Sequence, residues 1–195
     1  MRTSRMEAFS DGVVAILITI MVLELHIPDE PTAAALKPLV PVFLAYLLSF
    51  VNLGIYWNNH HHMLQVTERV TGRVLWANLH LLFWLSLFPF FTGWMSENHF
   101  ARVPVASYGV VLLAAGAAYF LLQTSIIACQ GPGSPLAAAI GRDLKGKISL
   151  VLYAAAIPLA FLNRWLAVAL YVTVSLIWLV PDRRLEAVVD GGASS

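Results

Sequence analysis

The chain has 195 residues, of which 59% are hydrophobic and 12% charged, with a formal net charge of +1 and a mean hydropathy of +0.75. Soluble domains average roughly 45 to 50% apolar and 25% charged residues, so this composition excludes a soluble globular protein and indicates an integral membrane protein. The single cysteine, Cys129, excludes an intrachain disulfide.

Apolar windows separated by polar, proline-containing and glycine-containing breaks predict an all-α bundle of six membrane-spanning helices. A spanning helix needs about 20 mostly apolar residues, and the last two windows are shorter than that. Pro89, inside the third window, is expected to kink its helix. We treat residues 1–184 as one transmembrane domain and 185–195 as a polar cytoplasmic tail. The expected spans are 6–27, 39–64, 74–96, 104–129, 147–163 and 165–180.

The first span carries a carboxylate, Asp11, close to the start of its apolar run. A charge at the bilayer centre costs about 2.5 to 3.5 kcal/mol on insertion scales, so such acids usually face a protein interior and mark function. At 100° per residue, Ile16, Thr19, Ile20 and Leu23 share one stripe, whereas Asp11 lies about 140° from Ile16. The helix therefore has two different faces.

The stripe on the first span has several interpretations that periodicity alone leaves open. An apolar stripe on a membrane helix usually faces lipid or packs against another helix, and a pore lining is the third interpretation. Thr19 has a simple local role as well, because a threonine in a helix often donates to a carbonyl three or four residues earlier, here expected to be that of Ala15.

The second and third spans carry polar side chains that can pair with Asp11. Trp57 lies three and four residues before His60 and His61, so these three side chains share a face, while His62 is turned away from it. Polar groups inside a membrane need protein partners. We therefore expect one hydrogen-bonded cluster that joins the first three spans, made of Arg5, Ser10, Asp11, Trp57, His60, His61 and Asn78.

Two sharper interpretations of this cluster remain open beside hydrogen bonding. Three consecutive histidines beside an acid suggest zinc, but a helical zinc pair favours positions i and i+4, and consecutive residues point about 100° apart. Asp11, Glu24 and the histidines are also candidates for a proton relay. The spacing favours structural hydrogen bonding over both alternatives.

The distribution of basic residues predicts the orientation of the chain. Cytoplasmic loops of membrane proteins carry an excess of Lys and Arg. One set of alternate loops holds only Lys37, Arg102 and Arg164, and the other set holds nine basic residues, so both termini are expected in the cytoplasm. The nine are Arg2, Arg5, Arg69, Arg73, Arg142, Lys145, Lys147, Arg183 and Arg184.

Motifs in the first three spans resemble those of the transmembrane protein 175 family of lysosomal-type potassium channels. The resemblance covers about half of the chain and rests on span count alone beyond that. In the first span it is carried by Arg5, Phe9-Ser10-Asp11, Ala15-Ile16, Thr19 and Leu23-Glu24. In the second and third spans it is carried by Phe43-Leu44, Ser49-Phe50, Trp57, His60-His61, Asn78-Leu79, Pro89-Phe90 and Thr92.

The resemblance implies a cation channel in which the first helices of four six-helix units line a central pore. Ile16, Ile20 and Leu23 would then form an apolar constriction, and Thr19 with Ile16 would select the ion. The motif of Arg5, Phe9, Ser10 and Asp11 would belong to the polar network that holds the pore helix. Animal members carry two units per chain, so this chain looks like a prokaryotic homotetramer of the bacterial inner membrane.

The same resemblance implies a passive, potassium-preferring channel without enzymatic activity. We expect no cofactor and no tightly bound metal, with K⁺ as the permeant ion near Ile16 and Thr19. The expected partners are further copies of the chain, the lipid bilayer and potassium ions, with no nucleic acid. A proton-coupled secondary transporter that uses Asp11, His60 and His61 is the alternative function. An integral-membrane metal hydrolase is a third.

Overall fold

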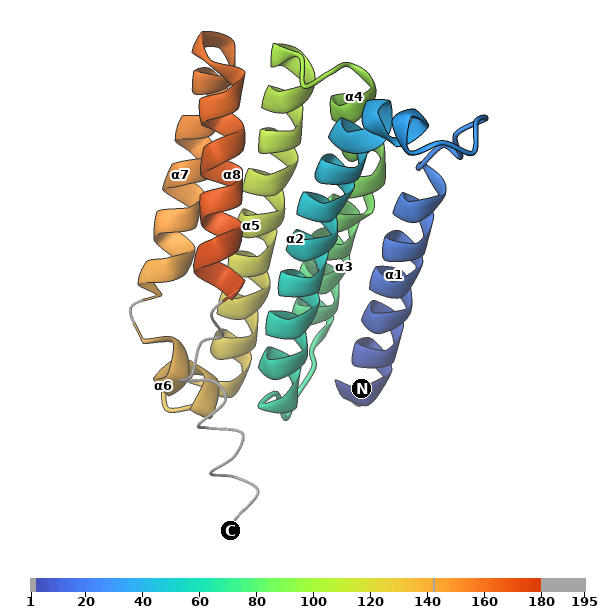
Figure 1. Ribbon diagram of the computed structural model, residues 1–195. Helices are drawn as coiled ribbons and strands as arrows, with labels where there is room; N and C mark the ends of the chain where they lie inside the picture. The colour runs from blue at the N-terminus through green and yellow to red at the C-terminus, as the bar shows by residue number, and fades with distance from the viewer. Residues whose placement is uncertain (1–2, 142, 180–195) are drawn as a thin grey trace.

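The computed structural model describes residues 3–141 and 143–179, and every regular element within them is a helix (Figure 1). The predicted all-α class is therefore confirmed. The predicted tail and four of the basic residues used for orientation, Arg2, Arg142, Arg183 and Arg184, lie outside the described residues. In chain order the helices are α1 Thr3–Leu23, the 3₁₀ helix η1 Ala33–Leu39, α2 Val40–Gln65, α3 Gly72–Ser86, α4 Phe88–Glu97, α5 Arg102–Gln130, α6 Pro135–Ile140, α7 Leu144–Leu162 and α8 Arg164–Leu179.

Five helical segments in the described part of the chain are long and apolar enough to cross a membrane. The sixth predicted span corresponds to α8, which has 16 residues and would extend about 24 Å at 1.5 Å per residue. That length is short against a hydrocarbon core of about 30 Å. The five long segments are Thr3–Leu23, Ala33–Gln65, Gly72–Glu97, Arg102–Gln130 and Leu144–Leu162.

The two main differences between the observed and the expected helix boundaries each have a proline nearby. The first span was expected to reach residue 27, whereas α1 ends at Leu23, and Pro28 disfavours a helical conformation at the residue before it. The third span was expected to run unbroken over 74–96. It is instead divided into α3 and α4 at Leu87, with Pro89 in the first turn of α4, where a missing N–H group costs least.

Helix α5 lies at the centre of the bundle and packs against α3, α4, α7 and α8. Its contact with α8 is close at Gly109, because a Cβ atom at that position would overlap the hydroxyl of Tyr171. The Tyr171 hydroxyl donates to the carbonyl of Val105 at 3.0 Å, and its ring packs edge-on against Tyr108. A large aromatic side chain thereby replaces the missing side chain of the glycine in the core.

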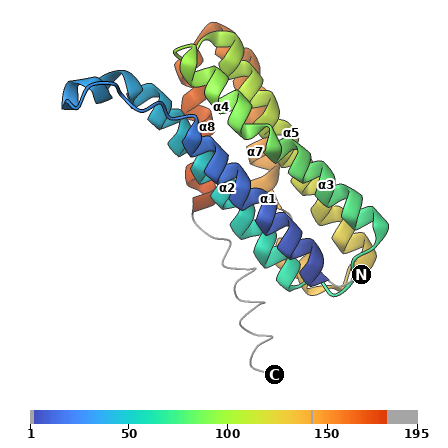
Figure 2. The same ribbon diagram turned by 90° about the vertical axis from the view of Figure 1, so that its right-hand side faces the viewer.

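Helix α1 lies at one edge of the bundle, opposite α7 (Figure 1). It packs against α2, α3 and α4 on one side. Viewed from that edge, α1 runs along the front of the bundle and no other described helix covers it (Figure 2). One complete face of a membrane-length helix is therefore left without a partner inside the subunit.

Candidate functional site: the free face of α1 and the polar contacts behind it

Helix α1 divides into a buried face and a free face. The buried face packs against the rest of the bundle and consists of Met6, Ser10, Val14, Leu17 and Met21. These positions are three or four residues apart, which is the spacing of one face of an α-helix. The opposite face carries the stripe that the sequence analysis singled out.

The four residues of the predicted stripe are all exposed in the single subunit. Leu23 is 80% exposed, Ile16 58% and Ile20 41%, and Thr19 lies exposed among them. Aliphatic side chains with such exposure must contact lipid, another copy of the chain or a pore. The free face of α1 is the side that carries Ile16, Thr19, Ile20 and Leu23.

The Thr19 hydroxyl has a defined orientation on this face. It donates to the carbonyl of Ile16 at 2.8 Å, so the acceptor is three residues earlier and is not the expected carbonyl of Ala15. A hydroxyl has one donor hydrogen and two acceptor lone pairs. Because the hydrogen is used within the helix, the lone pairs of the exposed oxygen remain available to a cation.

Behind the free face, Asp11 is tied to α2. The indole Nε1 of Trp57 donates to Asp11 Oδ1 at 2.9 Å. Asp11 is half-buried, and a hydrogen bond to a charged acceptor is about twice as strong as one between neutral groups. The acid of the first span is therefore engaged with the neighbouring helix and not with the stripe residues.

A second connection joins α1, α2 and α3 through a directed chain of hydrogen bonds. Asn78 Nδ2 donates to Ser10 Oγ at 3.0 Å, and Ser10 Oγ donates to the carbonyl of Met6 at 2.8 Å. His60 Nε2 lies 2.7 Å from Asn78 Oδ1, and since that oxygen can only accept, His60 Nε2 carries the proton. His60, Ser10 and Asn78 are all buried, so these hydrogen bonds join the three helices in the interior of the subunit.

A third connection involves Glu7, which the sequence analysis did not include. His61 Nδ1 lies 2.9 Å from Glu7 Oε1, and Gln65 Nε2 lies 2.8 Å from His61 Nε2. The His61 ring also stacks on Trp57, with 5.9 Å between ring centroids. The sequence contained a signal for this contact. Glu7 lies four residues before Asp11, and His61 lies four residues after Trp57, so on antiparallel helices the two pairs lie one turn apart on the same side.

These contacts do not include every residue expected in the network. Arg5 is exposed, and no hydrogen bond or ion pair joins it to another residue of the described ranges. Phe9 is 54% exposed and lies on the same side of α1 as Ile16. Within residues 3–141 and 143–179, no group of three or more His, Cys, Asp or Glu side chains is placed to hold a metal ion.

Comparison with protein families and curated proteins gives consistent matches. Residues 5–89 match the family described as "Endosomal/lysosomal potassium channel TMEM175". A protein of Chryseobacterium sp. that is named a potassium channel is 51% identical over 186 residues, which cover 95% of this chain and 97% of that protein. The human "Endosomal/lysosomal proton channel TMEM175" is 32% identical over 112 residues, which cover 51% of this chain and 22% of the human protein.

A solved structure supports the same relationship at the level of the fold. It is the crystal structure of a lysosomal potassium-selective channel TMEM175 homolog from Chamaesiphon minutus. The two structures superpose with a TM-score of 0.81 at 28% sequence identity, over 92% of this chain and 97% of the other. The similarity extends through nearly the whole bundle, beyond the three helices that carry the sequence motifs.

Proposed function

The chain belongs to the TMEM175 family of potassium channels, and we propose that four copies form a potassium-preferring pore lined by the free face of α1. Family and relatives are channels and not enzymes. The observation that carries the proposal is the exposure of Ile16, Thr19, Ile20 and Leu23 on a helix whose other side is packed and hydrogen-bonded. A homotetramer would cover this face with three further copies of the same helix.

In this proposal Ile16, Ile20 and Leu23 form stacked apolar rings that gate the pore. Narrow hydrophobic constrictions exclude water and so block ions until they widen. The three side chains occupy successive turns of one face, so four copies would give consecutive rings along one axis. Conduction would then require the rings to move apart, and a dehydrated ion would pass near Ile16.

Thr19 would supply the polar layer between these rings. Its hydroxyl hydrogen is donated to the carbonyl of Ile16, so the oxygen would offer lone pairs to K⁺ near Ile16 and Thr19. One such oxygen per subunit replaces only part of a hydration shell. Such a layer would give a preference for potassium, the ion with the lower cost of dehydration, without strict selectivity.

The polar contacts behind the free face support a positioning role for their residues. Asp11, Ser10 and Glu7 join α1 to Trp57, Asn78 and His61. Contacts of this kind hold side chains on the opposite face in a defined orientation. We assign this role to Ser10, Asp11, Trp57, His60, His61 and Asn78, and Arg5 and Phe9 would belong to the same motif through contacts between subunits.

The cellular setting is part of the proposal. The distribution of basic residues puts both termini in the cytoplasm, and the bacterial relatives support the inner membrane of a bacterial cell.

Proton conduction is a second candidate function for the same protein. It is favoured by the names of the mouse, rat and human relatives, which are called proton channels. A proton-coupled carrier would use Asp11, His60 and His61, which lie behind the free face in contact with neighbouring helices. A channel and a carrier differ in their response to ion gradients: a carrier saturates and couples two fluxes, and a channel for K⁺ or for protons does neither.

Reconstitution into liposomes tests the proposal. We expect passive K⁺ efflux down its gradient, faster than Na⁺ efflux and independent of a pH gradient. Native mass spectrometry of the same preparation should give four chains per particle. A monomeric particle, or K⁺ flux that occurs only with an opposing proton gradient, would contradict the tetrameric pore.

A further inference from the structure

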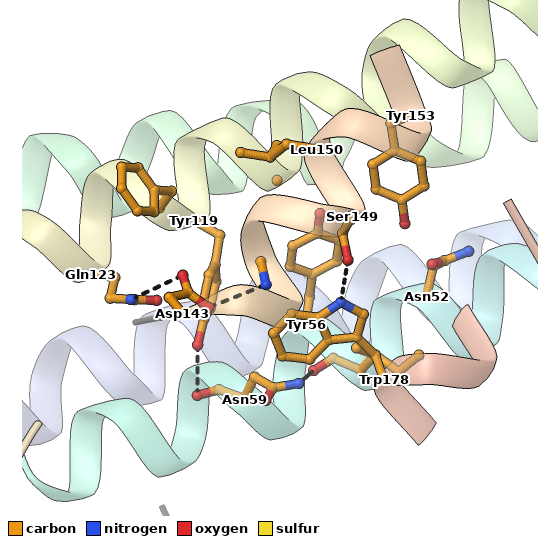
Figure 3. Close-up of a pocket in the computed structure, with 14 residues that line it drawn as sticks. Asn52, Tyr56, Asn59, Tyr119, Gln123, Asp143, Ser149, Leu150, Tyr153 and Trp178 are labelled. Carbon is orange, nitrogen blue, oxygen red and sulfur yellow. Dashed lines mark hydrogen bonds between the residues drawn. The ribbon is translucent and has the colours of Figure 1, made fainter. Parts of the chain in front are cut away.

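The interior of the subunit contains a cavity that is separate from the free face of α1. It has a volume of about 60 Å³, enough for several water molecules when about 10 to 15 Å³ of such space holds one. The cavity lies between α2, α5, α7 and α8, near the end of the bundle that carries α6 (Figures 1 and 3). None of its lining residues belongs to α1.

Aromatic rings form much of the lining. Tyr56 comes from α2, Tyr119 and Phe120 from α5, Tyr153 from α7 and Trp178 from α8. The negative faces of such rings attract cations, and tryptophan does so most strongly. The Lys145 Nζ lies 5.9 Å from the centroid of Trp178, so this ring engages a cation in the subunit itself.

A single acid, Asp143, supplies the only charge among the described residues that line the cavity. Its carboxylate accepts from the backbone N–H of Gly146 at 3.1 Å and from Gln123 Nε2 at 3.3 Å (Figure 3). Both donors are neutral, and each carboxylate oxygen can accept further hydrogen bonds. Among the described residues that line the cavity, the charge is therefore negative, and the cation near it, Lys145, lies outside the lining over the ring of Trp178.

Two hydroxyls complete the site. Neither Tyr56 nor Tyr153 forms a side-chain hydrogen bond with the described part of the chain, and Tyr153 is only 4% exposed. In Figure 3 the ring of Tyr153 lies at the end of the cavity opposite Asp143. These two hydroxyls are therefore available to an occupant that can form hydrogen bonds.

From these contacts we propose that the cavity binds a small organic ammonium ion with an aromatic or aliphatic body. The ammonium group donates to Asp143, and the body packs against Tyr56, Tyr119 and Trp178. A smaller hollow of about 20 Å³ shares Asp143 and Trp178 and continues toward Leu136 and Ile140 of α6, which provides apolar space for a longer substituent. This site is independent of the proposed pore, because no residue of the free face contributes to it.

Isothermal titration calorimetry on the full-length protein in lipid nanodiscs tests this site, with 2-phenylethylammonium chloride as the probe and neutral 2-phenylethanol as its comparison. Asp143→Asn removes the charge while asparagine still caps α7, and should weaken ammonium binding at least about tenfold, as expected for a lost charge-assisted contact. Tyr153→Phe should weaken it several-fold. Glu68→Gln, an exposed acid outside the cavity, is the matched control and should leave the affinity unchanged.

The remaining outcomes overturn the proposal in distinguishable ways. Failure of the wild-type protein to bind the probe would show that the cavity holds only water. If 2-phenylethanol bound as tightly as 2-phenylethylammonium, the charge of Asp143 would have no role in binding. Binding that survives Asp143→Asn but is lost in Thr19→Ala would assign the probe to the free face of α1.

Discussion

The indole nitrogen of Trp57 lies 2.9 Å from a carboxylate oxygen of Asp11, and this contact joins α1 to α2 behind the face proposed to line the pore. We predict that Trp57→Phe and Asp11→Asn each lower the thermal stability of the oligomer, by about 1 to 3 kcal/mol, because the first removes the hydrogen-bond donor and the second replaces the charged acceptor with a neutral one. The combined variant should lose less than the sum of the two single variants.

The control for this pair is Asp29→Asn, which changes an exposed acid between α1 and α2. Thermal melts followed by size-exclusion chromatography give the stability, and liposome flux gives the ion preference. A stable Asp11→Asn protein with inverted K⁺ over Na⁺ preference would show that the carboxylate faces the pore instead.

Ile16→Asn should raise K⁺ conductance or reduce its preference over Na⁺. An amide in place of a branched aliphatic side chain would let water remain in the narrowest ring of the proposed constriction. Single-channel recording in planar bilayers measures both quantities. Ile148→Asn, which alters a half-exposed isoleucine of α7, should behave as wild type, and unchanged currents from well-folded Ile16→Asn protein would exclude Ile16 from the pore.

Thr19→Ala should lower the permeability ratio of K⁺ to Na⁺ by roughly two- to tenfold, the range expected for the loss of one hydrogen-bonding group. Thr19→Ser keeps the hydroxyl and should retain the wild-type ratio. Reversal potentials under bi-ionic conditions give the measurement. Thr173 forms the same kind of local bond, to the carbonyl of Ala169 at 2.7 Å, so a similar effect of Thr173→Ala would argue that only helix geometry had changed.

Asn78→Leu should destabilise the protein more than Ser10→Ala does. The leucine leaves the Nε2 donor of buried His60 without its acceptor, at about 1 to 3 kcal/mol, and removes the donor to Ser10, which keeps its bond to the carbonyl of Met6. Alanine at position 10 leaves the bond between His60 and Asn78 in place. Midpoints of thermal unfolding in the same detergent compare the two. Asn98→Ala is the control, because the side chain of this exposed asparagine donates to the carbonyl of Trp94 one turn earlier. If Asn98→Ala lowered the unfolding midpoint as much as Asn78→Leu, the hydrogen bonds that join His60, Asn78 and Ser10 would have no special role in stability.

Gly109→Ala should lower stability by about 1 to 3 kcal/mol, the usual cost of overpacking a core. The added methyl group would overlap the hydroxyl of Tyr171 in the interface between α5 and α8. The compensating variant is Tyr171→Phe together with Gly109→Ala, which removes the overlapping oxygen and should recover part of the loss. Gly133→Ala has open space around its Cβ position and should be neutral in the same melting assay.

Helical periodicity predicted the essential asymmetry of α1 from the sequence. The residues placed on one stripe, among them Ile16 and Leu23, are exposed, while Asp11 lies behind them against α2. The same periodicity did not single out Glu7, which lies one turn before Asp11 on α1. The repeated spacing of four residues on antiparallel helices would have paired Glu7 with His61 once Asp11 was paired with Trp57.

The interior cavity could not be predicted in the same way. Tyr56, Tyr119, Asp143 and Trp178 come from four segments that are far apart in the chain, and each residue is unremarkable in its own helix. From the sequence alone, Asp143 is an acidic residue in a loop that precedes a helix. Only the packing of α7 and α8 against α2 and α5 places its carboxylate beside a group of rings.

Two hydrogen-bonded contacts join α1 to α2: Asp11 with Trp57, and Glu7 with His61. Together they restrict how α1 can move against α2. One contact acts as a pivot, whereas two contacts separated by a full turn resist both rolling and sliding of the helix. Widening of the proposed pore would therefore take one of two routes: α1 and α2 move together as a rigid pair, or α1 bends beyond these two contacts. Gly12 directly follows Asp11, and a Cβ atom built at Gly12 would have no neighbour within 4 Å. A bend of α1 at this glycine would therefore meet no packed side chain.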